Sequence, residues 1–297
     1  MPVPKKIGVL YSGTKKSLRK QLDAFLEGLK EENPGFVPGK KIKIIGPRYA
    51  DDDYETKLPK HAKNLIDTEK VAVLVAAGGP VSALAAQKAT TTIPIVFTSV
   101  ANPVRNGLVT SAKSPGGNLT GVMGLTTEKD LDRLKWLQHF KPTARKIGVL
   151  VNPNRPNVKQ ETADLLAAAD KKLELVVEEA GAVGKIKTAI KQLATQNVEA
   201  LLVTADPFFN SERPTVIQEV AARNLPAIYQ WREFVEEGGL MSYGPSLNEE
   251  YRYAGKYVGR VLKGEDPAEM ALYEPTTFEL VINSSTAKAL GVTVPPR

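Results

Sequence analysis

Small hydroxyl and glycine residues follow three apolar runs in the first half of the chain. They form the segments Ser12-Gly13-Thr14, Ala77-Gly78-Gly79-Pro80 and Thr98-Ser99-Val100-Ala101-Asn102. In parallel sheets, ligands meet the carboxyl ends of strands and the amino ends of the following helices, where N–H groups are unpaired. These segments therefore predict a wall of donors that attracts a carboxylate, because helix starts carry partial positive charge. The alternative interpretation is that the residues only turn the chain.

The corresponding segments of the second half carry aromatic rings and one carboxylate. They are Asn152-Pro153-Asn154, Asp206-Pro207-Phe208-Phe209-Asn210 and Gln230-Trp231, with Tyr243 further along. Asp206 could pair with a ligand ammonium or simply cap the next helix. Adjacent aromatics in a polar turn favour a surface for a ring, whereas Trp231 and Tyr243 could be core residues with a wet polar tip. The ligand contacts predicted in this half are Asn154, Asp206, Phe208, Trp231 and Tyr243.

The elements that must position these segments occur twice. Residues 5–14 read KKIGVLYSGT and residues 145–154 read RKIGVLVNPN. In the same order, residues 72–78 (AVLVAAG) match 200–206 (ALLVTAD), and residues 93–97 (IPIVF) match 225–229 (LPAIY). Segments with helical periodicity alternate with these runs, which indicates parallel sheets with right-handed crossovers. Two similar α/β halves whose strand ends converge predict a cleft that holds a small ligand.

Three segments are predicted to cross between the halves. Residues 111–124 have loop chemistry around one short extended segment, residues 240–245 form a short strand broken by Gly-Pro, and residues 278–282 form a last strand. We expect an N-terminal lobe of residues 1–120 plus 246–275 and a C-terminal lobe of residues 121–245 plus 276–297. Asp52 and Glu55 have the spacing of a capping box at the start of a helix.

Composition narrows the functional classes. A chain of 297 residues, with 42% hydrophobic and 25% charged residues, suits about two soluble domains. There are no cysteines and only two histidines, His61 and His139, so we expect no metal site. The net charge of +7 is spread along helices, and we expect no nucleic-acid partner. Dinucleotide, phosphate-loop and hydrolase-elbow motifs are missing, and no cofactor is predicted.

No apolar run approaches the roughly 18 residues that a membrane span needs, and no signal peptide is visible. The protein is therefore expected to be cytoplasmic, or to be exported by a signal that was removed and replaced by a starting Met.

The chain resembles the periplasmic substrate-binding proteins of ABC transporters with the type I fold, and in particular the family that includes tryptophan-binding TrpX-like proteins. The resemblance extends from Ile7 to Val294 and is strongest at residues 93–103 (IPIVFTSVANP), 115–122 (PGGNLTGV), 238–245 (GGLMSYGP) and 275–283 (PTTFELVIN). It implies two Rossmann-like α/β lobes joined by a three-segment hinge. It also implies a periplasmic or membrane-anchored extracytoplasmic protein that acts as a monomer and delivers ligand to an ABC permease.

The family's ligands imply an aromatic amino acid or a related small acid. By position, the resemblance assigns the pocket to Ser12, Thr14, Gly79, Ser99, Asn154, Asp206, Phe208 and Tyr243, with Asp206 as the residue that takes an ammonium. The aromatic loop after residue 206 departs from the polar Thr-Asp-Asn type of some members. An aromatic carboxylic acid without an amine therefore stays open as the ligand.

Two other classes share this architecture. The effector-sensing domain of a transcriptional regulator should carry a helix-turn-helix ahead of the first strand, yet only six residues precede Ile7. A two-lobed transferase acting on a nucleotide sugar would need a catalytic base and phosphate-binding basic residues, and the chain shows no such constellation. We therefore expect a binding protein rather than an enzyme.

Overall fold

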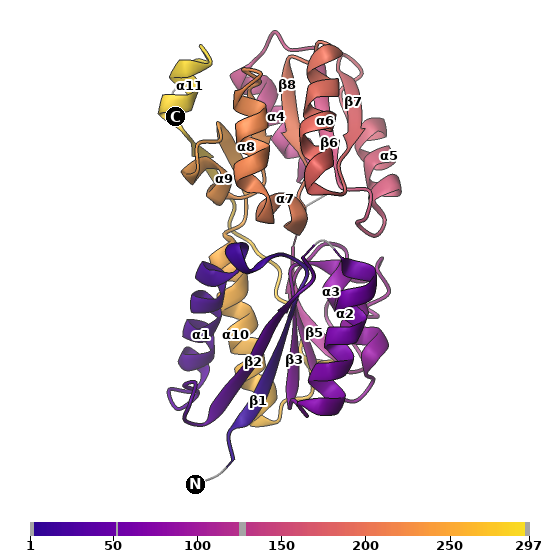
Figure 1. Cartoon of the computed structure of the whole chain (residues 1–297), viewed down its shortest axis with the longest axis vertical. Helices are drawn as coiled ribbons and strands as arrows, with labels where there is room; N and C mark the ends of the chain where they lie inside the picture. The colour runs from indigo at the N-terminus through magenta and orange to yellow at the C-terminus, as the bar shows by residue number, and fades with distance from the viewer. Residues whose placement is uncertain (1–2, 52, 125–128, 295–297) are drawn as a thin grey trace. The chain divides into compact units, whose positions relative to one another are not determined.

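The computed structural model describes residues 3–51, 53–124 and 129–294, and the chain forms two compact units. Unit 1 comprises residues 1–125 and 247–276, and unit 2 comprises residues 126–246 and 277–297 (Figure 1). The chain therefore passes from one unit to the other three times. The predicted fold class, with two α/β halves built on largely parallel sheets, is confirmed.

Unit 1 is built on a five-stranded parallel sheet with the order β2-β1-β3-β4-β5. The strands are β1 (Lys5–Tyr11), β2 (Ile42–Tyr49), β3 (Val73–Ala77), β4 (Ile95–Val100) and β5 (Leu119–Met123). The helices are α1 (Arg19–Glu32), α2 (Tyr54–Lys63), α3 (Pro80–Ala89) and α10 (Leu247–Lys263), with short turns at Lys15–Ser17, Asn64–Thr68 and Pro267–Glu269. Strands β3 and β4 are buried along their whole length, because helices cover both faces of a parallel sheet.

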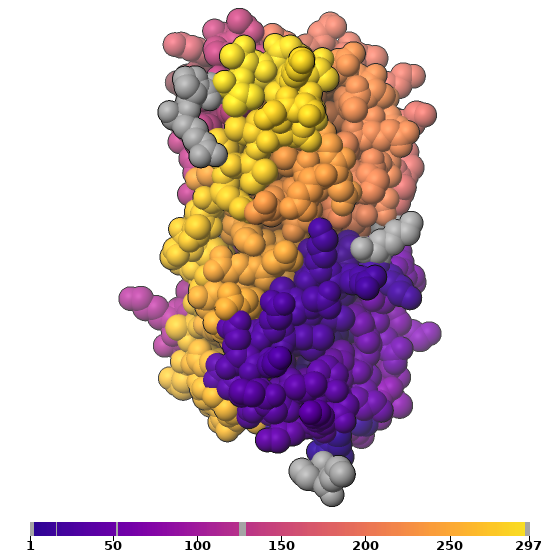
Figure 2. All heavy atoms as spheres, turned by 90° about the vertical axis from the view of Figure 1, so that its left-hand side faces the viewer, coloured from indigo at the N-terminus to yellow at the C-terminus, as the bar shows by residue number. Residues whose placement is uncertain are grey.

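Helices α1 and α10 lie side by side in unit 1, although more than two hundred residues separate them in the sequence (Figure 1). Two glycines allow this close approach. A Cβ atom on Gly28 would lie 1.8 Å from the Arg252 carbonyl oxygen, and one on Gly255 would lie 2.0 Å from the Phe25 carbonyl oxygen. Figure 2 shows the outer surface of the pair, indigo beside orange. This contact fixes the C-terminal segment of unit 1 to its N-terminal segment.

Unit 2 repeats the arrangement with a six-stranded sheet of order β11-β10-β9-β8-β6-β7. The strands are β6 (Lys146–Val151), β7 (Glu174–Glu179), β8 (Ala200–Val203), β9 (Ala227–Tyr229), β10 (Met241–Gly244) and β11 (Glu279–Ile282). The helices are α4 (Asp130–Phe140), α5 (Val158–Ala168), α6 (Val183–Thr195), α7 (Pro207–Ser211), α8 (Arg213–Ala221), α9 (Arg232–Glu236) and α11 (Ser284–Ala289). All pairings are parallel except that of β10 with β11.

The internal repeat is confirmed by the strand orders. Strands β6 to β10 take the places in unit 2 that β1 to β5 take in unit 1, and β11 adds one antiparallel edge strand. The three matched sequence pairs correspond to β1 with β6, β3 with β8, and β4 with β9. Each of these strands is a short branched apolar run that is buried in the core of its own unit. The carboxyl ends of equivalent strands therefore carry the equivalent loops.

The structure corrects the predicted crossing segments. Residues 111–124 include β5, which pairs with β4, so residues 121–123 belong to the unit 1 sheet rather than to the C-terminal lobe. The first passage lies next to residues 125–128, which fall outside the described residues. The other two passages lie beside β10 and β11 rather than in them, since both strands pair within the unit 2 sheet. Asp53 caps α2 by accepting from the Thr56 N–H, and Asp52 of the predicted capping box lies outside the described residues.

Candidate functional site

The carboxyl edge of the unit 1 sheet is a hydrogen-bonded set of small residues. The Ser12 hydroxyl donates to the Gly78 carbonyl, and the Gly78 N–H donates to Thr98 Oγ1 at 3.2 Å. The next N–H, that of Gly79, donates to the Thr98 carbonyl at 3.1 Å. In the structure these groups donate to neighbouring residues of the same edge, and their predicted role as donors to a ligand stays a prediction. The first-turn N–H groups of α3, which begins at Pro80, have no acceptor within their own helix.

Glycine is required at position 78 by both conformation and space. Its φ angle is +83°, which disfavours residues with a Cβ. A Cβ atom there would lie 2.4 Å from Ser12 Oγ and 2.8 Å from the Tyr11 ring. The loop after β3 therefore packs directly on the loop after β1, and the edge of unit 1 has a single tight arrangement.

Ser99 and Val100 occupy different environments although they are neighbours. Ser99 has a φ angle of +55° at an irregularity in the β4–β5 register, and its hydroxyl donates to the Glu250 carboxylate of α10. The left-handed backbone is uncommon for a serine and directs its side chain to the helix start. Val100 is fully buried, and its side chain packs in the unit 1 core.

Gly13 and Thr14 form the bend that follows β1. Thr14 precedes the short turn at Lys15–Ser17, and its carbonyl accepts from the Ser17 hydroxyl at 3.0 Å. The side chain of Thr14 is half-buried, while Gly13 is buried. Both residues therefore lie at the same carboxyl edge as Ser12, as the sequence predicted.

The carboxyl edge of unit 2 is charged. Asp206 follows β8 and caps α7, with Oδ1 accepting from the Phe208 N–H at 2.7 Å and from Asn152 Nδ2 at 3.0 Å. Because Asp206 is buried, desolvation raises the pKa of its carboxyl group, and the positive charge of Arg155 acts in the opposite direction. The capping role proposed as the alternative for Asp206 is thus present in the structure, and a second partner from the β6 loop holds the carboxylate in place.

Arg155 connects this carboxylate to the surrounding elements. Its Nη1 donates to the Ala205 carbonyl at 3.0 Å, and its Nη2 lies 2.7 Å from Glu161 Oε2 on α5. Both side chains of this ion pair are buried. Arg155 therefore forms its ion pair with Glu161, and among the described residues Asp206 accepts from an amide and a backbone N–H rather than from a cation.

Two of the residues predicted in unit 2 have clear structural roles. Asn154 shapes its loop, since its N–H donates to Asn152 Oδ1 at 3.0 Å and its side-chain Nδ2 donates to the Gly181 carbonyl at 2.9 Å. Tyr243 packs beside Trp136 and Phe278, with ring centroids 6.0 Å apart in both pairs. The interpretation of Tyr243 as a half-buried packing residue therefore has direct support.

The other aromatic residues of this edge are buried in unit 2. Phe208 and Phe209 pack on each other with ring centroids 5.4 Å apart. Trp231 begins α9, and its Nε1 has no hydrogen-bond partner among the described residues. The same holds for both side-chain amide atoms of Gln230. The sequence named Gln230 only as part of a loop, so its side chain is a feature that sequence reasoning missed.

Three further residues of the two edges were also not predicted as contacts. Asn152 directly follows β6, and its position at a strand end is the signal that could have identified it. Arg155 lies three residues further in the same loop. Glu250 comes from a helix 151 residues after Ser99, and no local pattern connects the two.

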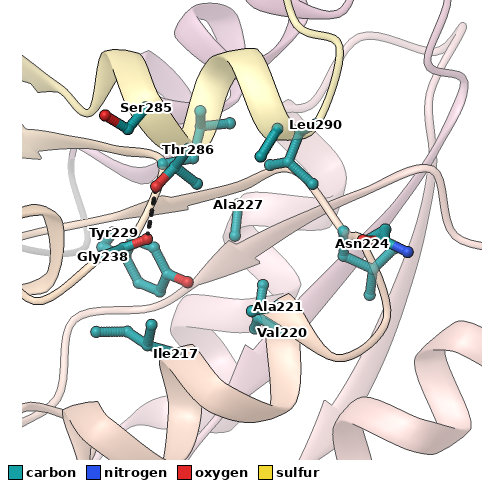
Figure 3. Close-up of a pocket in the computed structure, with 14 residues that line it drawn as sticks. Ile217, Val220, Ala221, Asn224, Ala227, Tyr229, Gly238, Ser285, Thr286 and Leu290 are labelled. Carbon is teal, nitrogen blue, oxygen red and sulfur yellow. Dashed lines mark hydrogen bonds between the residues drawn. The ribbon is translucent and has the colours of Figure 1, made fainter.

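Unit 2 also contains a cavity of about 330 Å³ between α8 and α11, drawn in Figure 3. It is lined by residues that precede β9 and β10, including Leu225 and Leu240, together with Tyr229. Thr286 of α11 donates to the Gly238 carbonyl at its margin. The lining contains none of the predicted site residues, so this cavity is separate from the carboxyl edge.

Within the described part of the chain, no three His, Asp or Glu side chains come together in a way that could hold a metal ion. None of the helices that the structure describes is both long enough and apolar enough to cross a bilayer.

Comparison with known proteins identifies the family. The family model described as ABC transporter substrate binding protein matches residues 2–297. A curated relative, the tyrosine-binding protein of Clostridioides difficile strain R20291, is 31% identical over 290 residues, which cover 97% of this chain and 81% of the relative.

Two solved structures are similar over 99% of this chain and 96% of their own, each at 26% identity. The ABC domain from Streptococcus pneumoniae in complex with L-Trp has a TM-score of 0.87, and a conserved domain protein from Vibrio cholerae has a TM-score of 0.89. With a family match along essentially the whole sequence and this fold, the chain belongs to the substrate-binding proteins of ABC transporters.

Proposed function

We propose that this protein captures an aromatic α-amino acid for an ABC importer. The observation that carries the proposal is the buried Asp206 carboxylate, held by Asn152 and by the Phe208 N–H at the start of α7, on an edge that also carries the buried Trp231. A fixed carboxylate without a direct cationic partner among the described residues suits an ammonium group, and adjacent aromatic surface suits a ring.

Relatives support the same ligand class. One relative is named as a tyrosine-binding protein, and a structural neighbour was solved in complex with L-Trp. Both ligands combine an ammonium, a carboxylate and an aromatic ring. The ligand of this chain is proposed to share these three groups, with an aromatic carboxylic acid lacking the amine as the nearest alternative.

The proposed contacts come from the carboxyl edges of both sheets. In unit 1 they are Ser12, Gly13, Thr14, Gly78, Gly79, Pro80 and Ser99, and in unit 2 they are Asn154, Asp206, Phe208 and Trp231. The helix start at Pro80 supports carboxylate binding, because its first-turn N–H groups and the helix dipole favour negative charge. Val100 and Tyr243 complete the proposed set, and their side chains also pack within their own units.

Substrate-binding proteins bind small molecules and work with ABC permeases outside the cytoplasm. We extend this role to the present chain and propose that it acts as an extracytoplasmic monomer without binding nucleic acid. It is proposed to release its ligand unchanged. Recovery of chemically altered ligand after incubation, measured by mass spectrometry, would contradict the proposed absence of catalysis.

A ligand panel tests the proposed function. L-tryptophan, L-tyrosine, L-phenylalanine, benzoate, L-leucine and a sugar are compared by thermal shift and isothermal titration calorimetry. At a ligand concentration of 100 times Kd, binding should stabilise the protein by about 2.7 kcal/mol. The aromatic amino acids should stabilise it most. Stabilisation by leucine or the sugar, with none by any aromatic compound, would overturn the proposal.

A further inference from the structure

Gln230 is a buried amide at the carboxyl edge of unit 2. It directly follows β9, its side chain is 2% exposed, and neither Oε1 nor Nε2 has a hydrogen-bond partner among the described residues. Most buried polar side-chain atoms in proteins are paired, because an unpaired one loses its hydration without compensation. An amide with both ends unpaired is therefore a feature that needs a physical explanation.

The position of Gln230 is specified by its surroundings. A Cβ atom on Gly244 of the neighbouring β10 would lie 2.3 Å from the Gln230 carbonyl oxygen and 3.1 Å from its Cγ. Glycine at this position therefore makes room for both the backbone and the side-chain stem of Gln230. The close fit between Gly244 and Gln230 indicates that neighbouring residues fix the position of Gln230.

Gln230 and Asp206 follow two neighbouring strands of the unit 2 sheet, β9 and β8. Strands β8 and β9 are neighbours in register, with Leu202 opposite Ile228, so the residues that follow them emerge at the same edge of the sheet. Neighbouring strands are about 4.8 Å apart. The indole Nε1 of Trp231, the next residue along the chain, is likewise buried and unpartnered among the described residues. Two neutral hydrogen-bonding groups thus accompany the carboxylate.

The two groups differ from Asp206 in carrying no charge. Under the proposed function, on which this inference rests, Asp206 pairs with the ligand ammonium. The charge of Asp206 is then matched, and the uncharged, buried Gln230 amide on the same edge of unit 2 suits a neutral polar group on the ring. Such a group is an efficient discriminator, because the analogue without it leaves buried protein atoms unpaired.

We propose that Gln230, assisted by the Trp231 indole, reads a neutral hydrogen-bonding group on the aromatic ring of the ligand. A phenolic hydroxyl can accept from an N–H of either residue and donate to Gln230 Oε1. An indole N–H can only donate to Oε1, and a phenyl ring satisfies neither residue. Gln230 is therefore a specificity-determining residue that favours hydroxylated or nitrogen-bearing rings over a plain phenyl ring.

Titration of three ligands against two variants tests the proposal. L-tyrosine, L-tryptophan and L-phenylalanine are measured with the parent protein, with Gln230→Leu, and with Gln196→Leu as control. Gln196 is an exposed glutamine of unit 2 whose amide donates to Glu178 Oε1. Gln230→Leu should weaken tyrosine roughly tenfold, tryptophan by less, and phenylalanine by less than about twofold. The control should change none of the three affinities.

The contradicting outcomes are distinct. Equal weakening of all three ligands would assign Gln230 to the amino-acid head group, and unchanged affinities would remove it from the site. Failure of the parent protein to bind any of the three would refute the proposed function itself. If Gln230→Leu does not fold, as judged by circular dichroism, Gln230→Met and Trp231→Phe provide the same comparison and should reduce the preference for tyrosine over phenylalanine.

Discussion

At the carboxyl edge of unit 1, Ser12, Gly78 and Thr98 hydrogen-bond to one another through short neutral groups. At the equivalent edge of unit 2, Asp206 lies near the buried Arg155–Glu161 ion pair, and Gln230 and Trp231 have unpartnered polar atoms among the described residues. The strand orders of the two units correspond, so the sheet does not cause this difference. The difference comes from the loops, whose residue types differ between the two units while the strand order is the same.

The comparison suggests a division of roles. The neutral groups of Ser12, Gly78 and Thr98 are paired internally and have little freedom to adapt, and the start of α3 beside them favours an anion. At the edge of unit 2, the buried charge and the polar atoms without partners among the described residues lower the folding stability. A ligand that pairs with these groups regains that free energy on binding. Selectivity for the ligand is therefore expected to reside mainly in unit 2.

The largest effect on stability is expected from removing a buried ion pair of unit 2. Arg133 is fully buried, its Nε donates to the Tyr243 carbonyl at 2.8 Å, and it forms an ion pair with Asp130. Arg133→Met leaves Asp130 buried without this cation and should lower the free energy of unfolding by about 3–5 kcal/mol. Urea denaturation measures the change.

A matched surface pair provides the control for this prediction. Lys135 lies on the same helix, and its Nζ is 3.2 Å from Asp132 Oδ1. Because this pair is at the surface, Lys135→Ala should cost about 0–1 kcal/mol. If Arg133→Met costs no more than Lys135→Ala, the buried ion pair does not stabilise unit 2.

The next effect tests the tight packing of the neutral edge in unit 1. Gly78→Ala places a methyl group against Ser12 and Tyr11 at a positive φ angle. The backbone cost should be about 1–2 kcal/mol, and the overlap should add about 1–3 kcal/mol. Gly107→Ala has a similar φ of +68° and no atom within 4 Å of its new Cβ, so it should show the backbone cost alone. Equal losses in thermal or urea unfolding would mean that the edge relaxes easily.

A smaller effect is expected when ligand affinity is measured against pH. Burial raises the pKa of Asp206, and only the ionised carboxylate attracts an ammonium. As pH falls through this raised pKa, affinity for an aromatic amino acid should decrease by roughly tenfold per unit. The effect of pH on folding stability has the opposite sign. The folded state binds this proton more tightly than the unfolded chain does. The destabilisation that the buried charge causes therefore disappears at low pH. Calorimetric affinities that stay constant down to the usual carboxyl range would contradict this assignment.

The fold could be predicted from sequence because three strand pairs repeat as branched apolar runs. The pairing of β5 with β4 was missed for a physical reason. Gly121 in β5 has a φ of +152°, and a Cβ there would lie 2.3 Å from the Phe97 carbonyl oxygen. A glycine that permits close strand packing has the same local signature as a loop glycine, so residues 111–124 were interpreted as a connection.

The site could be predicted only where a residue follows an apolar strand. Ser12 directly follows β1, Asp206 lies three residues after the end of β8, and each lies at the carboxyl edge of its sheet. Other predicted residues have partners from distant elements, which local sequence does not reveal. Glu250 of α10 accepts from Ser99, and Arg133 donates to the Tyr243 carbonyl 110 residues further along the chain. Sequence alone also does not reveal which buried groups lack partners, as with Gln230.

The most direct test of the account is a thermodynamic cycle between Asp206 and the ligand amine. L-tryptophan and indole-3-propionic acid, which lacks the amine, are titrated calorimetrically into the parent protein and into Asp206→Asn. Asparagine also caps helices well, so the melting temperature without ligand should change little. The variant should lose about 2–5 kcal/mol of affinity for tryptophan and little for the deaminated acid. Equal changes for the two ligands would show that Asp206 only caps α7 and would contradict the proposed ammonium site.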